Sequence, residues 1–368
     1  SPPLISLIPG SVDNVNILLL QDYKSELALY ISNVSSSLQS QTHAECVIRD
    51  PLQPLRDDLD LEIYDVFQTD HNKYKMYRAA IMQSIAKSTI TNLKILVVGP
   101  GKGPLVDIAV AALTEANILS YSTVTIVEKN SKCIDILLAK NRQDWNNKVI
   151  ILHSDVRDLH VENLGEYDIV VSELLGSFAC NELSPEIITS IPKGLYHLNT
   201  IWIPKEYTNY LQPIYSPLLS QMINRAQSRR PFIAELTKQS YKVLSAFKTL
   251  WTFKHDEGPL ELSRSKSVTF ENLSGPVHGF LGVFTSTLAE DCEIGIHPFQ
   301  KGTELFCPSW SPIYFPLDTT IMEESLTVSF KRCFDDEKVW YSYAIQGNIH
   351  NEYGQRYNIS KTSIPIQS

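Results

Sequence analysis

Short apolar runs alternate with amphipathic segments between residues 94 and 173, and this alternation constrains the fold more than any other feature. The segments between the runs include PLVDIAVAALTEA and SKCIDILLAKN, which have the pattern of helices. Short apolar strands joined by helical crossovers predict a parallel, doubly wound α/β sheet. Four runs have the composition of buried strands: KILVVG (94–99), TVTIVEKN (123–130), VIILHSD (149–155) and YDIVVSE (167–173).

The segments on either side of this region differ from it. Residues 15–20 (VNILLL) predict a buried strand, and residues 23–38 predict a helix that must pack on something outside this chain. Residues 58–88 predict two helices, the second capped at its start by Asp70. After about residue 200 short strands predominate, which predicts an antiparallel β-barrel or sandwich, interrupted by a helical segment over 216–238.

Composition narrows the class of protein. The formal net charge is −9, which argues against a nucleic-acid binder and suits a basic partner. No run of about 18 apolar residues indicates a membrane span. The six cysteines are scattered without paired metal-ligand spacing, so we expect free thiols, no structural zinc and an intracellular protein.

A glycine-rich loop follows the first strand of the predicted sheet. Gly99 and Gly101 lie in VVGPGKGPL, between a strand and a helix, where glycine allows close backbone approach to a ligand. The spacing is G-x-G-x-G, which differs from the dinucleotide pattern. Glu128 ends the next strand, the place from which an acidic side chain binds ribose hydroxyls. The alternatives are a tight turn that binds nothing and an exposed strand-end glutamate.

Asp155 ends the third strand and therefore lies at the same edge of the sheet. Its carboxylate is placed to meet an adenine amino group, and Val156 would add a backbone or apolar contact. The residue pattern supports equally well a second role, in which Asp155 caps the following turn.

Two glutamates occupy the loop after the fourth strand, in SELLGSFACNELSPE (172–186). Glu173 and Glu182 have no histidine or cysteine cluster nearby that would complete a metal site. Two roles then remain open: an acid/base pair, or a clamp for a guanidinium, whose planar fork matches carboxylates.

The double-glutamate stretch resembles the corresponding loop of the protein arginine methyltransferases, in the branch that makes symmetric dimethylarginine (type II). Several other stretches match that branch in order over about residues 50–345. They include PLQPLRDDLD, YDVFQTDHNKY, GPGKGPLV, VEKN, SDVR, IPKEYT, VHGFLGVF, SWSPIYFP and KVWYSYA. Several motifs in register are far more specific than one glycine loop.

The resemblance implies a Rossmann-like methyltransferase domain, followed by a β-barrel domain, and S-adenosylmethionine as cofactor, with S-adenosylhomocysteine as product. It implies that Glu173 and Glu182 hold the target guanidinium, between the ring of Phe67 and the ring of Trp310. Phenylalanine at position 67 goes with the symmetric product, since relatives making the asymmetric one have methionine there. The implied cofactor contacts are Tyr64, Lys73, Tyr74, Gly99, Gly101, Glu128, Asp155 and Val156.

Without the resemblance, a core role would be the better interpretation of Phe67 and of Trp310, and a solvated helical lysine that of Lys73. The chain also departs from the usual pattern in two places. Lys102 stands where arginine is usual, and a lysine cannot make a bidentate contact to the cofactor carboxylate. Cys180 replaces an aspartate often found between the two glutamates.

The resemblance divides the chain into three parts. Residues 1–50 would be the last strand–helix unit of an N-terminal TIM barrel with a linker, 51–200 the methyltransferase domain, and 201–368 the β-barrel with a dimerisation insertion near 216–238. It further implies arginine-rich protein substrates such as histone tails and splicing proteins, a role in chromatin regulation, homo-oligomers, a WD-repeat partner bound through the missing barrel, and a location in cytoplasm and nucleus.

Two other functions compete with this hypothesis. A scaffold that keeps the fold and works through partner binding is favoured by Lys102 and the missing barrel. A nicotinamide-dependent dehydrogenase is disfavoured by the glycine spacing and by the double-glutamate loop.

Overall fold

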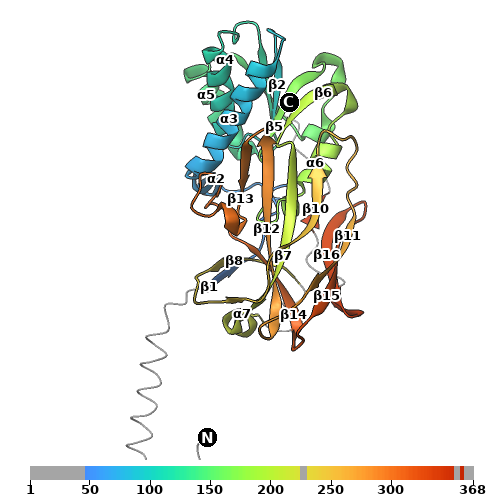
Figure 1. Cartoon of the computed structure of the whole chain (residues 1–368). Helices are drawn as coiled ribbons and strands as arrows, with labels where there is room; N and C mark the ends of the chain where they lie inside the picture. Colours follow the sequence, from blue (N-terminus) through green and yellow to red (C-terminus); the bar gives the residue numbers. More distant parts are fainter. Residues whose placement is uncertain (1–45, 224–229, 352–356, 360–368) are drawn as a thin grey trace, which may run out of the picture.

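The computed structural model describes residues 46–223, 230–351 and 357–359, and Figure 1 shows their arrangement. A parallel sheet flanked by helices stacks on an antiparallel β-rich part. The strand and helix predicted over residues 15–38 lie outside the described residues. No helix in the described ranges is long and apolar enough to cross a membrane.

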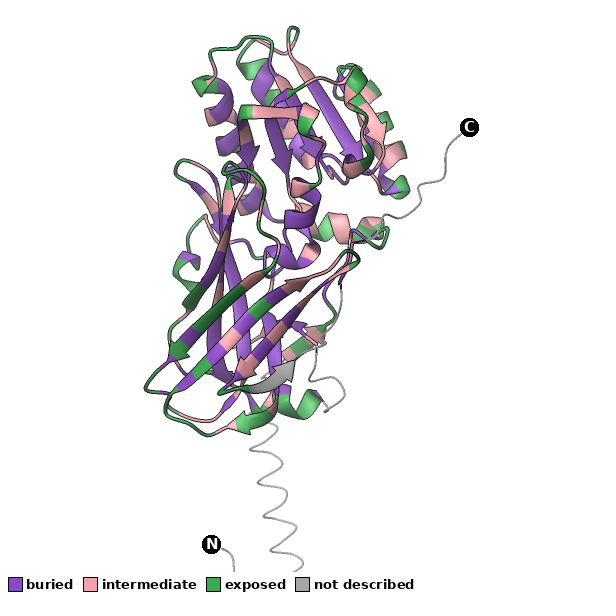
Figure 2. Cartoon of the chain, turned by 90° about the vertical axis from the view of Figure 1, so that its right-hand side faces the viewer, coloured by how far each residue is buried: buried purple, intermediate pink, exposed green. Residues whose placement is uncertain are grey.

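The predicted parallel sheet is present, with strand order β4-β3-β2-β5-β6. Its first four strands coincide with the four apolar runs, and every neighbouring pair is parallel. The bounds are β2 (Lys94–Val98), β3 (Thr123–Glu128), β4 (Val149–His153), β5 (Tyr167–Ser172) and β6 (Tyr196–Ile203). Most of these strands are coloured as buried in Figure 2, because helices cover the sheet.

Helices connect and cover these strands. The two helices predicted over residues 58–88 are confirmed, and the side chain of Asp70 caps the second by accepting a hydrogen bond from the Lys73 amide at 3.1 Å. The bounds are α2 (Leu61–Gln68), α3 (His71–Lys87), α4 (Pro104–Glu115), α5 (Ser131–Gln143), α6 (Ser184–Thr189) and α7 (Pro217–Met222).

The β-rich part consists of two antiparallel sheets. The larger has the order β1-β8-β14-β12-β7-β10, with β13 beside β12 and β9 beside β7. Its strands are β1 (Cys46–Arg49), β7 (Glu206–Tyr215), β8 (Phe232–Leu236), β9 (Lys242–Val243), β10 (Lys248–Lys254), β12 (Val277–Ala289), β13 (Cys292–Gly295) and β14 (Ile313–Ile321). The smaller has the order β11-β15-β16-β17, with β18 beside β16. Its strands are β11 (Arg264–Phe270), β15 (Leu326–Phe334), β16 (Lys338–Ile345), β17 (Asn348–Asn351) and β18 (Tyr357–Asn358).

Two predictions about the ends of the β-rich part were wrong in detail. Among the described residues of the segment 216–238, the helix covers Pro217–Met222 alone, and Phe232–Leu236 is a strand that pairs with β14 and β1. Residues 46–49, expected in a linker, form β1 at the edge of the larger sheet. The local sequence pattern could not show this, because a strand of four residues at the edge of a sheet depends on pairing with a neighbouring strand.

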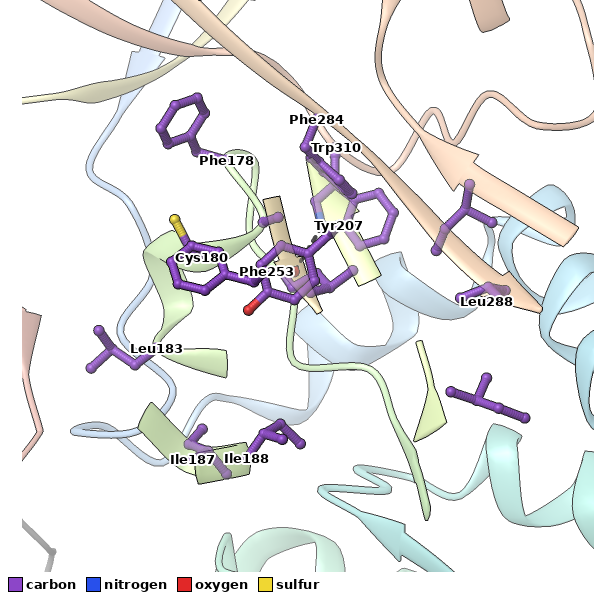
Figure 3. Close-up of a cluster of buried hydrophobic side chains, with 14 of the residues drawn as sticks. Phe178, Cys180, Leu183, Ile187, Ile188, Tyr207, Phe253, Phe284, Leu288 and Trp310 are labelled. Carbon is purple, nitrogen blue, oxygen red and sulfur yellow. Dashed lines mark hydrogen bonds between the residues drawn. The ribbon is translucent and has the colours of Figure 1, made fainter. Parts of the chain in front are cut away.

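One hydrophobic cluster runs through both parts of the molecule. Figure 3 shows Leu183, Ile187 and Ile188, which lie in and after the double-glutamate loop, in the same cluster as Tyr207 and Phe253 of the β-rich part. Because this loop is packed between the two parts, the position of each part affects the geometry of the loop.

Candidate active site

A pocket opens at the carboxyl ends of β2, β3, β4 and β5, between these strand ends, α2 and the β-rich part. All predicted site residues except Lys73 line it. Ligands bind at this edge of open parallel sheets, where the strand order reverses. The topology therefore brings together residues that are far apart in the sequence.

The glycine loop closes tightly against α2. Gly101 has a φ of +56°, and a Cβ built on it would lie 2.7 Å from the ring of Tyr64. The Tyr64 hydroxyl in turn accepts a hydrogen bond from the Asn130 side chain at 3.1 Å. Position 101 therefore requires glycine for conformation and for space.

The carboxylate of Glu128 is held by two backbone amides. Its Oε2 accepts from the Gly101 amide at 2.9 Å, and its Oε1 accepts from the Asn130 amide at 2.7 Å. Burial raises the pKa of Glu128, and these two hydrogen bonds oppose that change. Each oxygen keeps further lone-pair capacity, so the carboxylate can still accept from ribose hydroxyls.

Asp155 takes the second role that the sequence left open and also lines the pocket. Its side chain accepts from the Arg157 amide at 3.0 Å and caps the short 3₁₀ turn Val156–Asp158. The Arg157 guanidinium pairs with both carboxylate oxygens, at 2.9 and 2.6 Å. Arg157 was not among the predicted site residues, although an arginine two residues after a capping aspartate was a local signal for this ion pair.

The two glutamates of the loop lie in different environments. Glu173 follows β5 directly; its Oε1 accepts from the Leu175 amide at 3.2 Å, and its Oε2 lies 3.1 Å from the ammonium of Lys73. Glu182 ends the 3₁₀ turn Cys180–Glu182 and is partly buried. Burial, with a contribution from the carboxylate of Glu173, raises the pKa of Glu182 well above its usual value. The surroundings of Glu182 therefore disfavour its ionised form.

The ammonium of Lys73 lies among three aromatic rings. It is 4.4 Å from the ring centre of Trp310, 5.3 Å from that of Phe67 and 5.4 Å from that of Tyr74, and its side chain is fully buried. Cations are attracted to the faces of such rings. These rings and Glu173 therefore form a cation-binding site, which we call the cation cage, and the ammonium of Lys73 lies in it.

The β-rich part fixes one wall of the cation cage. The indole nitrogen of Trp310 donates to the Leu175 carbonyl at 3.1 Å. Asp70 accepts from the amide and the hydroxyl of Ser309, at 3.0 and 2.6 Å, in addition to capping α3. Asp70, the predicted cap residue, therefore also connects α3 to the loop that carries Ser309 and Trp310. The sequence did not indicate this role.

Lys102, the unusual residue of the glycine loop, forms an ion pair with Asp65 of α2. The ammonium therefore already has a carboxylate partner within the protein. Among the described residues no group of three or more metal-ligating side chains is present.

Solved structures define the class of protein to which this fold belongs. The chain is similar to the Trypanosoma brucei PRMT1 enzyme-prozyme heterotetrameric complex with AdoHcy, with a TM-score of 0.61 at 15% identity, over 82% of this chain and 99% of that one. It is also similar to Arabidopsis thaliana protein arginine methyltransferase 10, with a TM-score of 0.59 at 16% identity, over 81% and 97% of the two chains. The fold is that of the protein arginine methyltransferases.

Sequence comparison identifies the family. Residues 35–203 match the PRMT5 arginine-N-methyltransferase model, and residues 206–364 match the PRMT5 oligomerisation domain. Protein arginine N-methyltransferase skb1 of Schizosaccharomyces pombe is 34% identical over 85% of this chain, and protein arginine N-methyltransferase 5 of Xenopus laevis is 33% identical over 86%. The chain belongs to the PRMT5 family. It spans about half the length of these relatives, 53% and 52%.

Proposed function

We propose that this chain is the catalytic part of a type II protein arginine N-methyltransferase, which forms monomethylarginine and symmetric dimethylarginine from S-adenosylmethionine. The cation cage carries this proposal. A guanidinium is a planar cation that pairs with carboxylates and stacks on aromatic faces. Glu173, Glu182, Phe67 and Trp310 offer both kinds of contact beside the glycine loop.

The residues at the glycine loop fit S-adenosylmethionine. Gly101 lets the loop pack closely against the ring of Tyr64, and Glu128 is oriented by two amides with acceptor capacity left for two hydroxyls. Tyr64, Gly99, Asp155 and Val156 line the same pocket. Lys73 and Tyr74 would meet the carboxylate end. When bound, the cofactor supplies a methyl group on a sulfonium.

The two glutamates then orient the nucleophile. A guanidinium keeps its proton at neutral pH, so the site must localise its charge away from one nitrogen and direct that nitrogen at the methyl carbon. That nitrogen would accept the methyl group that the bound cofactor would supply, while Glu173 and Glu182 hold the rest of the guanidinium. The nitrogen then loses one proton, for which a carboxylate of the pair is the nearest acceptor.

The family also suggests substrates and partners. We propose glycine/arginine-rich proteins, including histone tails and splicing proteins, as substrates in the cytoplasm and nucleus. The match to an oligomerisation domain supports self-association. A WD-repeat partner would bind through an N-terminal barrel outside this chain. A scaffold role is favoured by Lys102 in the glycine loop, but both glutamates line the pocket and favour catalysis.

The test is mass spectrometry of an arginine-rich histone H4 tail peptide incubated with the chain and S-adenosylmethionine. We expect mono- and symmetric dimethylarginine from the wild type, their loss in Glu173→Gln, and no loss in the exposed control Glu304→Gln. S-adenosylhomocysteine binding by calorimetry should survive in all three proteins. Cofactor binding without methylation would contradict the proposed activity of this chain, and absence of both would contradict the cofactor assignment too.

A further inference from the structure

Arg332 is the largest fully buried side chain among the described residues, yet it lies outside the pocket. It belongs to β15 in the smaller antiparallel sheet. Its guanidinium packs 5.6 Å from the ring centre of Phe253. A buried charge is costly unless it is paired, so the partners of its two terminal nitrogens show what it holds in place, although Nε has no hydrogen-bond partner in the described part of the chain.

Most of those partners belong to the segment that carries Glu182. Nη1 and Nη2 of Arg332 donate to Oε1 and Oε2 of Glu186 at 2.7 and 2.8 Å, a bidentate pair. Nη2 also donates to the carbonyl of Cys180 at 3.2 Å, and Nη1 donates to the carbonyl of Leu262 at 2.8 Å. Arg332 therefore binds this segment at two positions, one two residues before Glu182 and one four residues after it.

The backbone of this segment depends on such contacts. Ala179 has a φ of +45° and Leu183 a φ of +70°, values that residues with a side chain rarely adopt. Backbone of this kind persists only where the surrounding structure imposes it. The bidentate pair supplies a fixed distance and orientation that a single point charge cannot supply.

We propose that Arg332 is a positioning residue for the reaction, which holds Glu182 at the angle needed to orient the guanidinium. The inference rests on the proposed function and adds a residue that touches neither substrate nor cofactor. It also explains how the β-rich part, which carries Arg332, affects a carboxylate on the other part of the molecule.

The test compares Arg332→Lys with Arg264→Lys in the whole chain. Lysine keeps the positive charge but cannot make the bidentate contact that the guanidinium makes with Glu186. Arg264 is a matched control, because it also lies over Phe253, at 4.6 Å, but pairs with the exposed Glu261. We expect kcat of Arg332→Lys to fall about 10- to 100-fold, since small misplacement of a catalytic group has effects of that order. The affinity for S-adenosylhomocysteine should stay within about twofold, and the control should match the wild type.

A second measurement separates positioning from general loss of structure. Cys180 is fully buried, with its thiol 3.2 Å from the Tyr341 hydroxyl. Alkylation of Cys180, followed by peptide mass spectrometry, should speed up in Arg332→Lys while buried Cys133 remains protected. An unchanged kcat in the folded variant would overturn the proposal, as would equal loss of kcat and cofactor affinity with both thiols exposed. If Arg332→Lys does not fold, Glu186→Asp shifts the same contact and is judged by the same outcomes.

Failure of the proposed function would look different. If the wild type methylates nothing, the wild type and Arg332→Lys are compared by calorimetric binding of the arginine peptide in the presence of S-adenosylhomocysteine. Weaker peptide binding by Arg332→Lys alone would then support the positioning role, and equal binding or no binding by both proteins would overturn it.

Discussion

The ammonium nitrogen of Lys73 lies 3.1 Å from Oε2 of Glu173 and is shielded completely from solvent. Its partner is the first glutamate of the loop. Under the proposed function a substrate guanidinium would compete with Lys73 for this carboxylate, and Lys73 would then pair with the carboxylate end of the cofactor.

Lys73→Met should therefore have opposite effects on the affinity for the cofactor and on the affinity for an arginine peptide. We expect cofactor affinity to fall and, without cofactor, affinity for an arginine peptide to rise about tenfold, because the ammonium no longer competes for Glu173. Breaking a buried ion pair costs about 3–5 kcal/mol; Glu173 is 13% exposed, so roughly 2–3 kcal/mol of unfolding free energy should be lost. Calorimetry and thermal unfolding measure these effects. Lys75→Met, on the exposed side of α3, is the control, and weaker peptide binding by Lys73→Met would contradict the competition.

The raised pKa of Glu182 predicts how the free energy of unfolding depends on pH. An acid whose pKa is higher in the folded chain binds its proton more tightly there. The unfolding free energy therefore falls as pH rises from about 4.5, the unfolded value, towards the folded pKa. Glu182→Gln should remove this loss and melt about 2–4 °C above the wild type at neutral pH, with a smaller difference near pH 4.5. Thermal unfolding at several pH values measures the difference, and a gap that shrinks as pH rises would show that folding lowers the pKa of Glu182 instead.

Gly101→Ala should abolish tight cofactor binding. The new Cβ would lie 2.7 Å from the Tyr64 ring, at a φ of +56° that disfavours a side chain. We expect the affinity for S-adenosylhomocysteine to fall at least about tenfold, that is, by about 1.4 kcal/mol or more. Gly302→Ala is a matched control, since its φ is +87° and nothing lies within 4 Å of its Cβ position. Similar cofactor affinity in the two variants would mean that the loop does not contact the ligand.

Phe67→Met tests the product assignment. The ring of Phe67 lies 6.2 Å from that of Tyr64 and on the edge of the cation cage. A flexible thioether changes the space beside the guanidinium, so we expect asymmetric dimethylarginine to appear beside the symmetric form. Fragmentation mass spectrometry distinguishes the two isomers. A product that stays purely symmetric would place the specificity elsewhere, and Phe299→Met, on an exposed ring, serves as the control.

The apolar runs and their spacing predicted the parallel sheet and its first four strands correctly, together with the cap at Asp70. These features are local, because hydrophobic period, glycine and capping residues act within a few positions of the chain. The location of the pocket was predicted as well, since the carboxyl ends of parallel strands meet at one edge of the sheet.

Only the tertiary structure decided which groups meet across that edge. The helical prediction over Phe232–Leu236 was wrong because pairing with β14 and β1 outweighed local pattern. The pairing of Lys73 with Glu173 and of Arg332 with Glu186 joins residues 100 and 146 positions apart. Ion pairs leave no period in a sequence, and burial selects their partners only after the two parts of the chain have packed together.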